Sequence, residues 1–168
     1  MIPQAVDREL ELMTRLVDQR VTGPDFDPHR QVLLLLQTLG EVGCVVNAPD
    51  AGARRWRNAA PDLLTVIMIA ADLAAHYGVP PHAADEWPDH TRIGGDGAHS
   101  AGYDSHHLFA EVVEAAGWVA EWVLGSTTPS PAWLVAVPTT ELLARTWCLA
   151  ELWDLRGVLR AAIEEQLR

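Results

Sequence analysis

Ionisable side chains recur at helical spacing in the second half of the chain. His107, Glu111, Glu114 and Glu121 are separated by four, three and seven residues, which places them on one face of an α-helix. Two carboxylates three residues apart, facing carboxylates of another helix, are a common way for helical bundles to hold Mg²⁺ or Mn²⁺. The alternative is that this face is only the solvated side of an amphipathic helix.

A single carboxylate interrupts an apolar run in the first half. Glu41 lies within residues 32–46, whose other side chains are apolar or neutral. An unpaired carboxylate is costly to bury, so Glu41 must be paired, bound to a cation, protonated or exposed. We predict that it faces another charged side chain across a helix interface rather than open solvent.

The order of these acidic positions resembles that of the all-α NTP pyrophosphohydrolases, the MazG-like family. The resemblance is carried by QTLGEVG (37–43) and PDLLTVIMIAADLAAHYGV (61–79), within residues 31–79, and more weakly by residues 108–158. The family pattern is ExxE on one helix and ExxD on the next. Thr38, Thr65 and Ala144 stand here at positions where the pattern has acids.

The resemblance implies Mg²⁺-dependent cleavage of a nucleoside triphosphate to a monophosphate and pyrophosphate. The expected ligand is therefore a nucleotide or another phosphorylated small molecule. Neither half has the complete set of acids, so an intact site would have to combine the two halves. The expected ligands for Mg²⁺ or Mn²⁺ are Glu41, Asp62, Glu111, Glu114 and Glu141.

Two other functions remain open on sequence alone. The first is a non-catalytic binding or assembly module in which the carboxylates pair with Arg145, Arg156 or Arg57. The second is an unrelated helical enzyme that uses the His/Asp-rich segment 80–103, although its spacings match no defined zinc pattern and favour a mobile acidic lid. Asp72 and His76 lie four residues apart and are expected to form a pair at a helix end.

Helical periodicity dominates the elements that must position these residues. No segment alternates convincingly with a period of two, and only Trp133–Val137 is strand-like. We predict an all-α bundle of about five helices, at residues 7–21, 28–46, 58–76 and 104–124, and from 139 or 140 to a break at Arg156-Gly157. Asn58 is the expected N-cap of the third helix, and Arg54–Arg57 are expected in a loop.

Residues 60–79 and 139–158 align at a constant offset, with Asp62 on Glu141 and Asp72 on Glu151. We therefore expect one all-α domain over residues 1–168, built from two pseudo-repeated helical hairpins (28–79 and 104–158) joined by segment 80–103. Leu- and Ala-rich helices also match by chance, so the duplication is a hypothesis.

Charge and composition narrow the classes of partner. The chain carries 23 acidic residues against 12 basic ones, a net charge of −11, which disfavours a nucleic-acid surface. The apolar runs fall short of the ~18 residues of a membrane span, and no signal peptide is evident, so a cytoplasmic protein is expected. Cys44 and Cys148 are expected to be reduced and buried. The apolar helix faces would be buried within a monomer or a homodimer.

Overall fold

The computed structural model describes residues 3–48, 53–79, 101–125 and 132–168, and within these ranges the chain is helical and contains no strand. The helices are α1 (Pro3–Gln19), α2 (Pro28–Val46), α3 (Ala53–Asn58), α4 (Ala60–His76), α5 (Ala101–Leu124), α6 (Ala132–Leu152) and α7 (Arg156–Gln166). The predicted all-α class is therefore confirmed. None of these helices is both long enough and apolar enough to cross a membrane.

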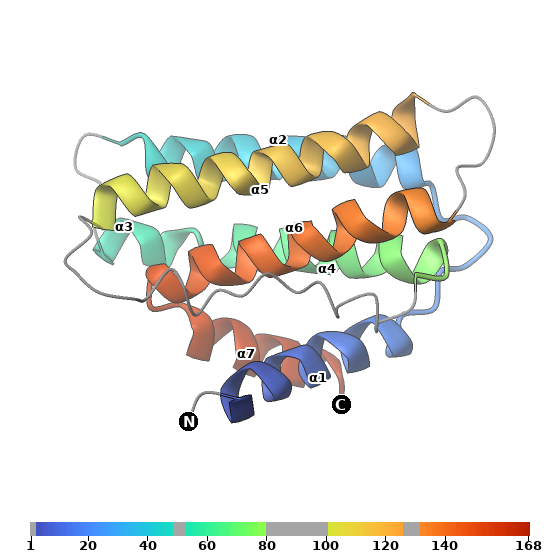
Figure 1. The fold of residues 1–168 in the computed structure, drawn as a ribbon, viewed down its shortest axis with the longest axis horizontal. Coiled ribbons are helices and arrows are strands. Elements are labelled where there is room, and N and C mark those ends of the chain that lie inside the picture. The colour runs from blue at the N-terminus through green and yellow to red at the C-terminus, as the bar shows by residue number, and fades with distance from the viewer. Residues whose placement is uncertain (1–2, 49–52, 80–100, 126–131) are drawn as a thin grey trace.

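The four long helices α2, α5, α6 and α4 form the body of the bundle. Each packs against the next in that order, and α4 packs back against α2. The interface between α2 and α4 and the interface between α5 and α6 therefore lie on opposite edges of a ring. Figure 1 shows α2 and α5 as one layer, α4 and α6 as the next, and α1 and α7 below them.

Local sequence explains why α2 begins and faces as it does. Asp27 caps the helix by accepting hydrogen bonds from the backbone N–H groups of His29 and Arg30 at 3.0 and 3.2 Å, and Pro28 occupies the first turn. One stripe at helical spacing is buried in the core: Val32, Leu35, Leu39, Val42 and Val46. The opposite side of α2 faces outward, away from the core.

Helix α4 is buried on several sides. It touches α1, α2, α6 and α7, which explains why its sequence is apolar on several sides rather than on one stripe. Its buried residues include Leu63, Ile67 and Leu73, all fully covered. Helices α1 and α7 cover the surface of α4 and α6 that α2 and α5 leave open.

An aromatic cluster ties α3 to the end of α6 and the start of α5. The rings of Trp56 and Trp153 stack with centroids 5.8 Å apart, and Trp153 Nε1 donates a hydrogen bond to Ser105 Oγ at 2.9 Å. Because both Trp153 and Ser105 are buried, this bond satisfies a polar group that water cannot reach. Arg54–Arg57 lie in α3 rather than in the predicted loop.

Several predicted helix boundaries were wrong. Helix α1 runs from Pro3 to Gln19 rather than over 7–21, and α5 begins at Ala101 rather than at 104. Residues 133–137 belong to α6, which begins at Ala132 and continues through Pro138, so they form neither a strand nor a loop. Ala59, not Asn58, is the N-cap of α4, and its side chain makes no capping bond. The break after α6 falls at residues 153–155, where Asp154 has a positive φ of 57°, slightly before the predicted Arg156-Gly157.

Candidate functional site

Arginine 145 joins two of the predicted metal ligands at the interface between α5 and α6. Its Nη1 lies 2.9 Å from Glu111 Oε2, and its Nε donates to Glu141 Oε2 at 2.6 Å. Glu141 and Arg145 are one turn apart on α6, whereas Glu111 comes from α5. The two carboxylates do converge, as the sequence predicted, but they converge on a guanidinium.

The network around Arg145 is partly buried. The side chains of Arg145, Glu111 and Glu141 are 20%, 27% and 19% exposed. Burial acts to lower the pKa of Arg145, but the hydrogen bonds and charges of Glu141 and Glu111 outweigh it, so the pKa is raised and the group stays cationic. His107 Nε2 lies 3.4 Å from the other oxygen of Glu111. The guanidinium thus supplies the positive charge that a metal ion would bring.

Glu41 and Asp62 form a separate pair at the interface between α2 and α4. Glu41 is exposed, so the prediction that it avoids open solvent was wrong. The pKa of Asp62 is raised, first by its own partial burial and second by the negative charge of Glu41. Glu41 therefore acts on a charged side chain across the helix interface. Two carboxylates that repel each other are thus held near the surface.

The five predicted ligands do not form one site within the chain. Glu41 and Asp62 lie at the α2–α4 interface and Glu111 and Glu141 at the α5–α6 interface, on opposite edges of the ring. Glu114 is exposed on α5. In the described ranges, no three His, Cys, Asp or Glu side chains are grouped so that they could hold a metal ion.

The positions where the family pattern calls for acids are occupied by side chains that serve the fold. Thr38 is buried, and its hydroxyl donates to the Leu34 carbonyl at 2.8 Å. Thr65 bonds the Pro61 carbonyl at 2.9 Å, and Ala144 is fully buried. Hydroxyls that bond back to their own helix are engaged, so these positions offer no acidic ligand.

The remaining predictions concern the Asp72–His76 pair, the two cysteines and the His/Asp-rich segment. Asp72 forms an ion pair with Arg20 at 2.9 Å, while the ring of His76 lies 4.7 Å from Phe26, centroid to centroid. Cys148 is buried as predicted, but Cys44 is exposed. Most of the His/Asp-rich segment, residues 80–100, lies outside the described residues.

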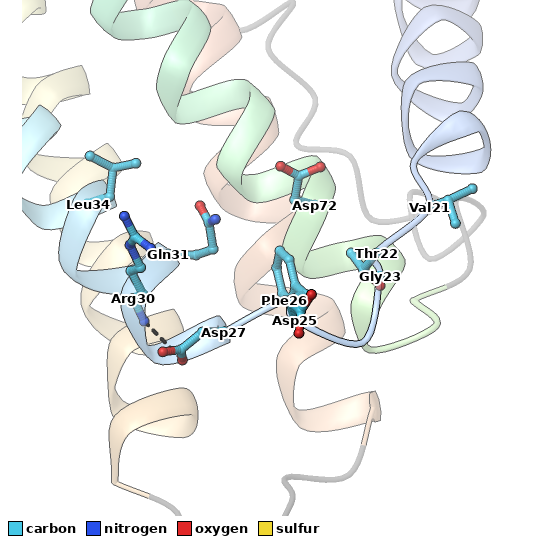
Figure 2. A pocket seen from close by; sticks show the side chains of 10 residues that line it. All are labelled: Val21, Thr22, Gly23, Asp25, Phe26, Asp27, Arg30, Gln31, Leu34 and Asp72. Atoms are coloured by element: carbon cyan, nitrogen blue, oxygen red, sulfur yellow. Dashed lines mark hydrogen bonds between the residues drawn. The ribbon is translucent and has the colours of Figure 1, made fainter.

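A cavity of about 620 Å³ adjoins the connection between α1 and α2, and sequence reasoning did not anticipate it. Its lining includes Asp25 and Phe26 from the connection, Arg30, Gln31 and Leu34 from α2, and Asp72 from α4 (Figure 2). The volume lies within the range of small-molecule sites. The only sequence signal was a run of charged and turn-forming residues before the cap of α2.

No family model, curated protein or solved structure matches the chain.

Proposed function

We propose that the protein is a non-catalytic helical module that forms a homodimer through the outer face of α2 and α5. This outer face is defined by the exposed residues Leu33, Leu36, Gly40, Val113 and Gly117. The observation that carries the proposal is its apolar character: Leu33, Leu36 and Val113 are 61%, 41% and 43% exposed. Clustered exposed apolar side chains are typical of protein interaction surfaces.

Helix geometry places the apolar side chains of the outer face along the shared edge of α2 and α5. A Cβ atom at Gly43 would lie 3.2 Å from Phe109 Cζ, so these two positions mark where the helices meet. Leu36 lies two turns before Gly43, and Val113 one turn after Phe109, which puts both on that side of their helices. The outer face is therefore formed by both helices.

Two glycines on the outer face have no role in packing within the chain. A Cβ atom at Gly40 or at Gly117 would meet no atom within 4 Å, and both residues are exposed in helix interiors. Glycine in such a position costs about 0.5–1 kcal/mol relative to alanine. A second helix packing closely against the backbone at these two positions would explain why glycine is present despite this cost.

Two copies of this acidic chain could associate only through a surface with few charges, and the α2 part of the outer face is such a surface. The net charge of −11 makes two copies repel each other unless they meet where charges are few. Residues 31–47 of α2 contain one charged side chain, Glu41, and it lies toward α4. On α5, Glu114 and Glu121 are also exposed, and Glu121 lies one turn after Gly117, so this end of the outer face carries negative charge that a contact would have to leave solvated.

The size of the outer face suits a dimer. Helices of 19 and 24 residues are about 28 and 36 Å long, and side by side they are about 20 Å wide. The resulting area, roughly 600–700 Å², approaches the ~800 Å² per partner of a stable interface.

The proposal that the module is non-catalytic rests on the acidic residues. Arg145 forms ion pairs with both Glu111 and Glu141, and Thr38 and Thr65 are engaged with backbone carbonyls. A catalytic magnesium ion requires several oxygen ligands around one point. On this proposal the sequence resemblance to the pyrophosphohydrolases does not extend to their activity.

Sedimentation velocity over a range of concentrations tests the assembly. We expect a concentration-dependent dimer for the wild type and a monomer for Leu33→Glu and for Leu36→Glu, because each places a charge in the contact. Val158→Glu is the matched control, since Val158 is 57% exposed on α7, away from the outer face. A wild type that stays monomeric throughout, or dimers that survive both substitutions, would refute the proposal.

A second candidate function has one observation in its favour. Glu41 and Asp62 are neighbouring carboxylates from two helices, and their repulsion would be relieved by a divalent cation. Bound Mg²⁺ or Mn²⁺ would raise the melting temperature, and a nucleoside triphosphate would then yield pyrophosphate. Release of pyrophosphate that is lost in Glu41→Gln and Asp62→Asn would favour this candidate over the non-catalytic one.

A further inference from the structure

Charged groups of both signs face the cavity between the α1–α2 connection and α4. The Arg30 guanidinium has no ion-pair partner among the described residues, and the same holds for the carboxylate of Asp25. Figure 2 shows Arg30 and Gln31 extending from α2 on one side and Asp72 from α4 on the other, with Phe26 below Asp72 and next to Asp25. The cavity therefore offers a cation and an amide opposite a carboxylate.

Asp72 and Arg20 form an ion pair without a well-formed hydrogen bond. Asp72 Oδ1 lies 2.9 Å from Arg20 Nε, but that buried N–H has no partner with hydrogen-bond geometry, so the contact is electrostatic. Burial raises the pKa of Asp72 more than the charge of Arg20 lowers it. The side chain is 28% exposed and lines the cavity, so a donor entering there could bond to this carboxylate.

We propose that this cavity binds a small zwitterion of the amino-acid class. Its ammonium group would lie against Asp72, with Asp25 nearby, and its carboxylate against Arg30 and Gln31. The ring of Phe26 offers an apolar surface to the rest of the ligand.

Ligands with charge of a single sign fit this lining less well. A simple anion would meet Arg30 but also the carboxylate of Asp25, that of Asp27, which caps α2, and that of Asp72, which is paired with Arg20. A simple cation would be attracted to these carboxylates but would leave Arg30 without a counter-charge. A zwitterion satisfies both groups at once, since charge-assisted hydrogen bonds at each end are stronger than neutral ones.

Isothermal titration of the full chain tests the proposal with a defined panel. The panel contains the proteinogenic amino acids and straight-chain ω-amino acids from glycine to 6-aminohexanoate, which vary the separation of the two charges. Each compound that binds is compared with its N-acetyl and carboxamide derivatives, which lack one charge. We expect at least one zwitterion to bind, and each derivative to bind about tenfold more weakly or worse.

Substitutions assign the binding to the cavity. We expect Arg30→Gln and Asp72→Asn each to weaken binding about tenfold or more, whereas Arg57→Gln, on the exposed surface of α3, should leave it unchanged. Asp72→Asn also removes the ion-pair partner of Arg20 and could weaken the fold. Arg30→Gln does not, so it tests the cavity independently. The proposal is overturned if no panel member binds at millimolar concentration, if the singly charged derivatives bind as well as the zwitterion, or if binding survives Arg30→Gln.

Discussion

Replacement of Arg145 by leucine tests whether the acidic cluster at the α5–α6 interface is structural. Leucine fills part of the same space but cannot contact Glu111 Oε2 or Glu141 Oε2, which lie 2.9 and 2.6 Å from the guanidinium. Two partly buried carboxylates would then face each other without a counter-charge. We expect the variant to fold but to be clearly less stable.

The exposure of the three side chains determines how much stability Arg145→Leu should remove. An exposed ion pair contributes up to ~1 kcal/mol, whereas removal of one partner from a fully buried pair costs ~3–5 kcal/mol. Arg145, Glu111 and Glu141 are 20%, 27% and 19% exposed, which is between these limits. We expect Arg145→Leu to lower the free energy of unfolding by about 2–3 kcal/mol, or the melting temperature by roughly 5–10 °C.

Urea denaturation followed by circular dichroism measures this loss. Arg57→Leu is the control for loss of an arginine, because Arg57 is exposed and has no ion pair among the described residues. Adding Glu111→Gln and Glu141→Gln to Arg145→Leu should recover much of the stability, since no unpaired charge remains. A loss below about 0.5 kcal/mol, or a magnesium-induced stabilisation of the wild type that needs both glutamates, would refute the reasoning.

Three further predictions follow from particular contacts. Gly40→Ala should raise the stability of the monomer by about 0.5–1 kcal/mol but weaken association, and sedimentation with denaturation at two concentrations separates these effects; unchanged association would place Gly40 outside the interface. Because the pKa of Asp62 is raised in the folded state, its ionisation destabilises the fold as pH rises through that pKa. Glu41→Gln should therefore lower this pKa and raise the stability at pH 7 by a few tenths of a kcal/mol, with no effect through Asp62 below its ordinary pKa of 3.8; an NMR titration that finds the pKa of Asp62 unmoved would contradict this. Ser105→Ala should cost about 1–2 kcal/mol because it leaves the buried Trp153 Nε1 without an acceptor, and an unaltered urea midpoint would mean that the bond contributes nothing.

The fold could be predicted from the sequence where local signals act alone. The predicted range 28–46 agrees with α2 as observed, since helix starts and apolar periodicity are set by residues close together in the sequence. The start of α6 was missed because Pro138 was read as a boundary. The helix instead continues through it, and the surrounding residues 135, 136 and 139 are buried, so tertiary packing compensates for the missing backbone donor.

The acidic site could be predicted only in part. The spacing of Glu141 and Arg145 is itself a pairing signal, but the approach of Glu111 from α5 depends on how two helices pack. The exposure of Glu41 was missed because an apolar run does not distinguish a core face from an outward interaction face. Helix α2 has a buried core face and also carries exposed apolar side chains, Leu33 and Leu36.

The rate at which a thiol reagent modifies Cys44 tests most directly whether two copies meet through the outer face. Cys44 is exposed and lies one turn after Gly40 on the outer face of α2, whereas Cys148 is buried, so a thiol reagent added to the folded protein reports on Cys44. If two copies meet through the outer face of α2 and α5, the rate of modification should fall as the protein concentration rises, and Leu36→Glu should abolish that dependence. A wild-type rate that is the same across the whole dilution series would contradict the proposed dimer.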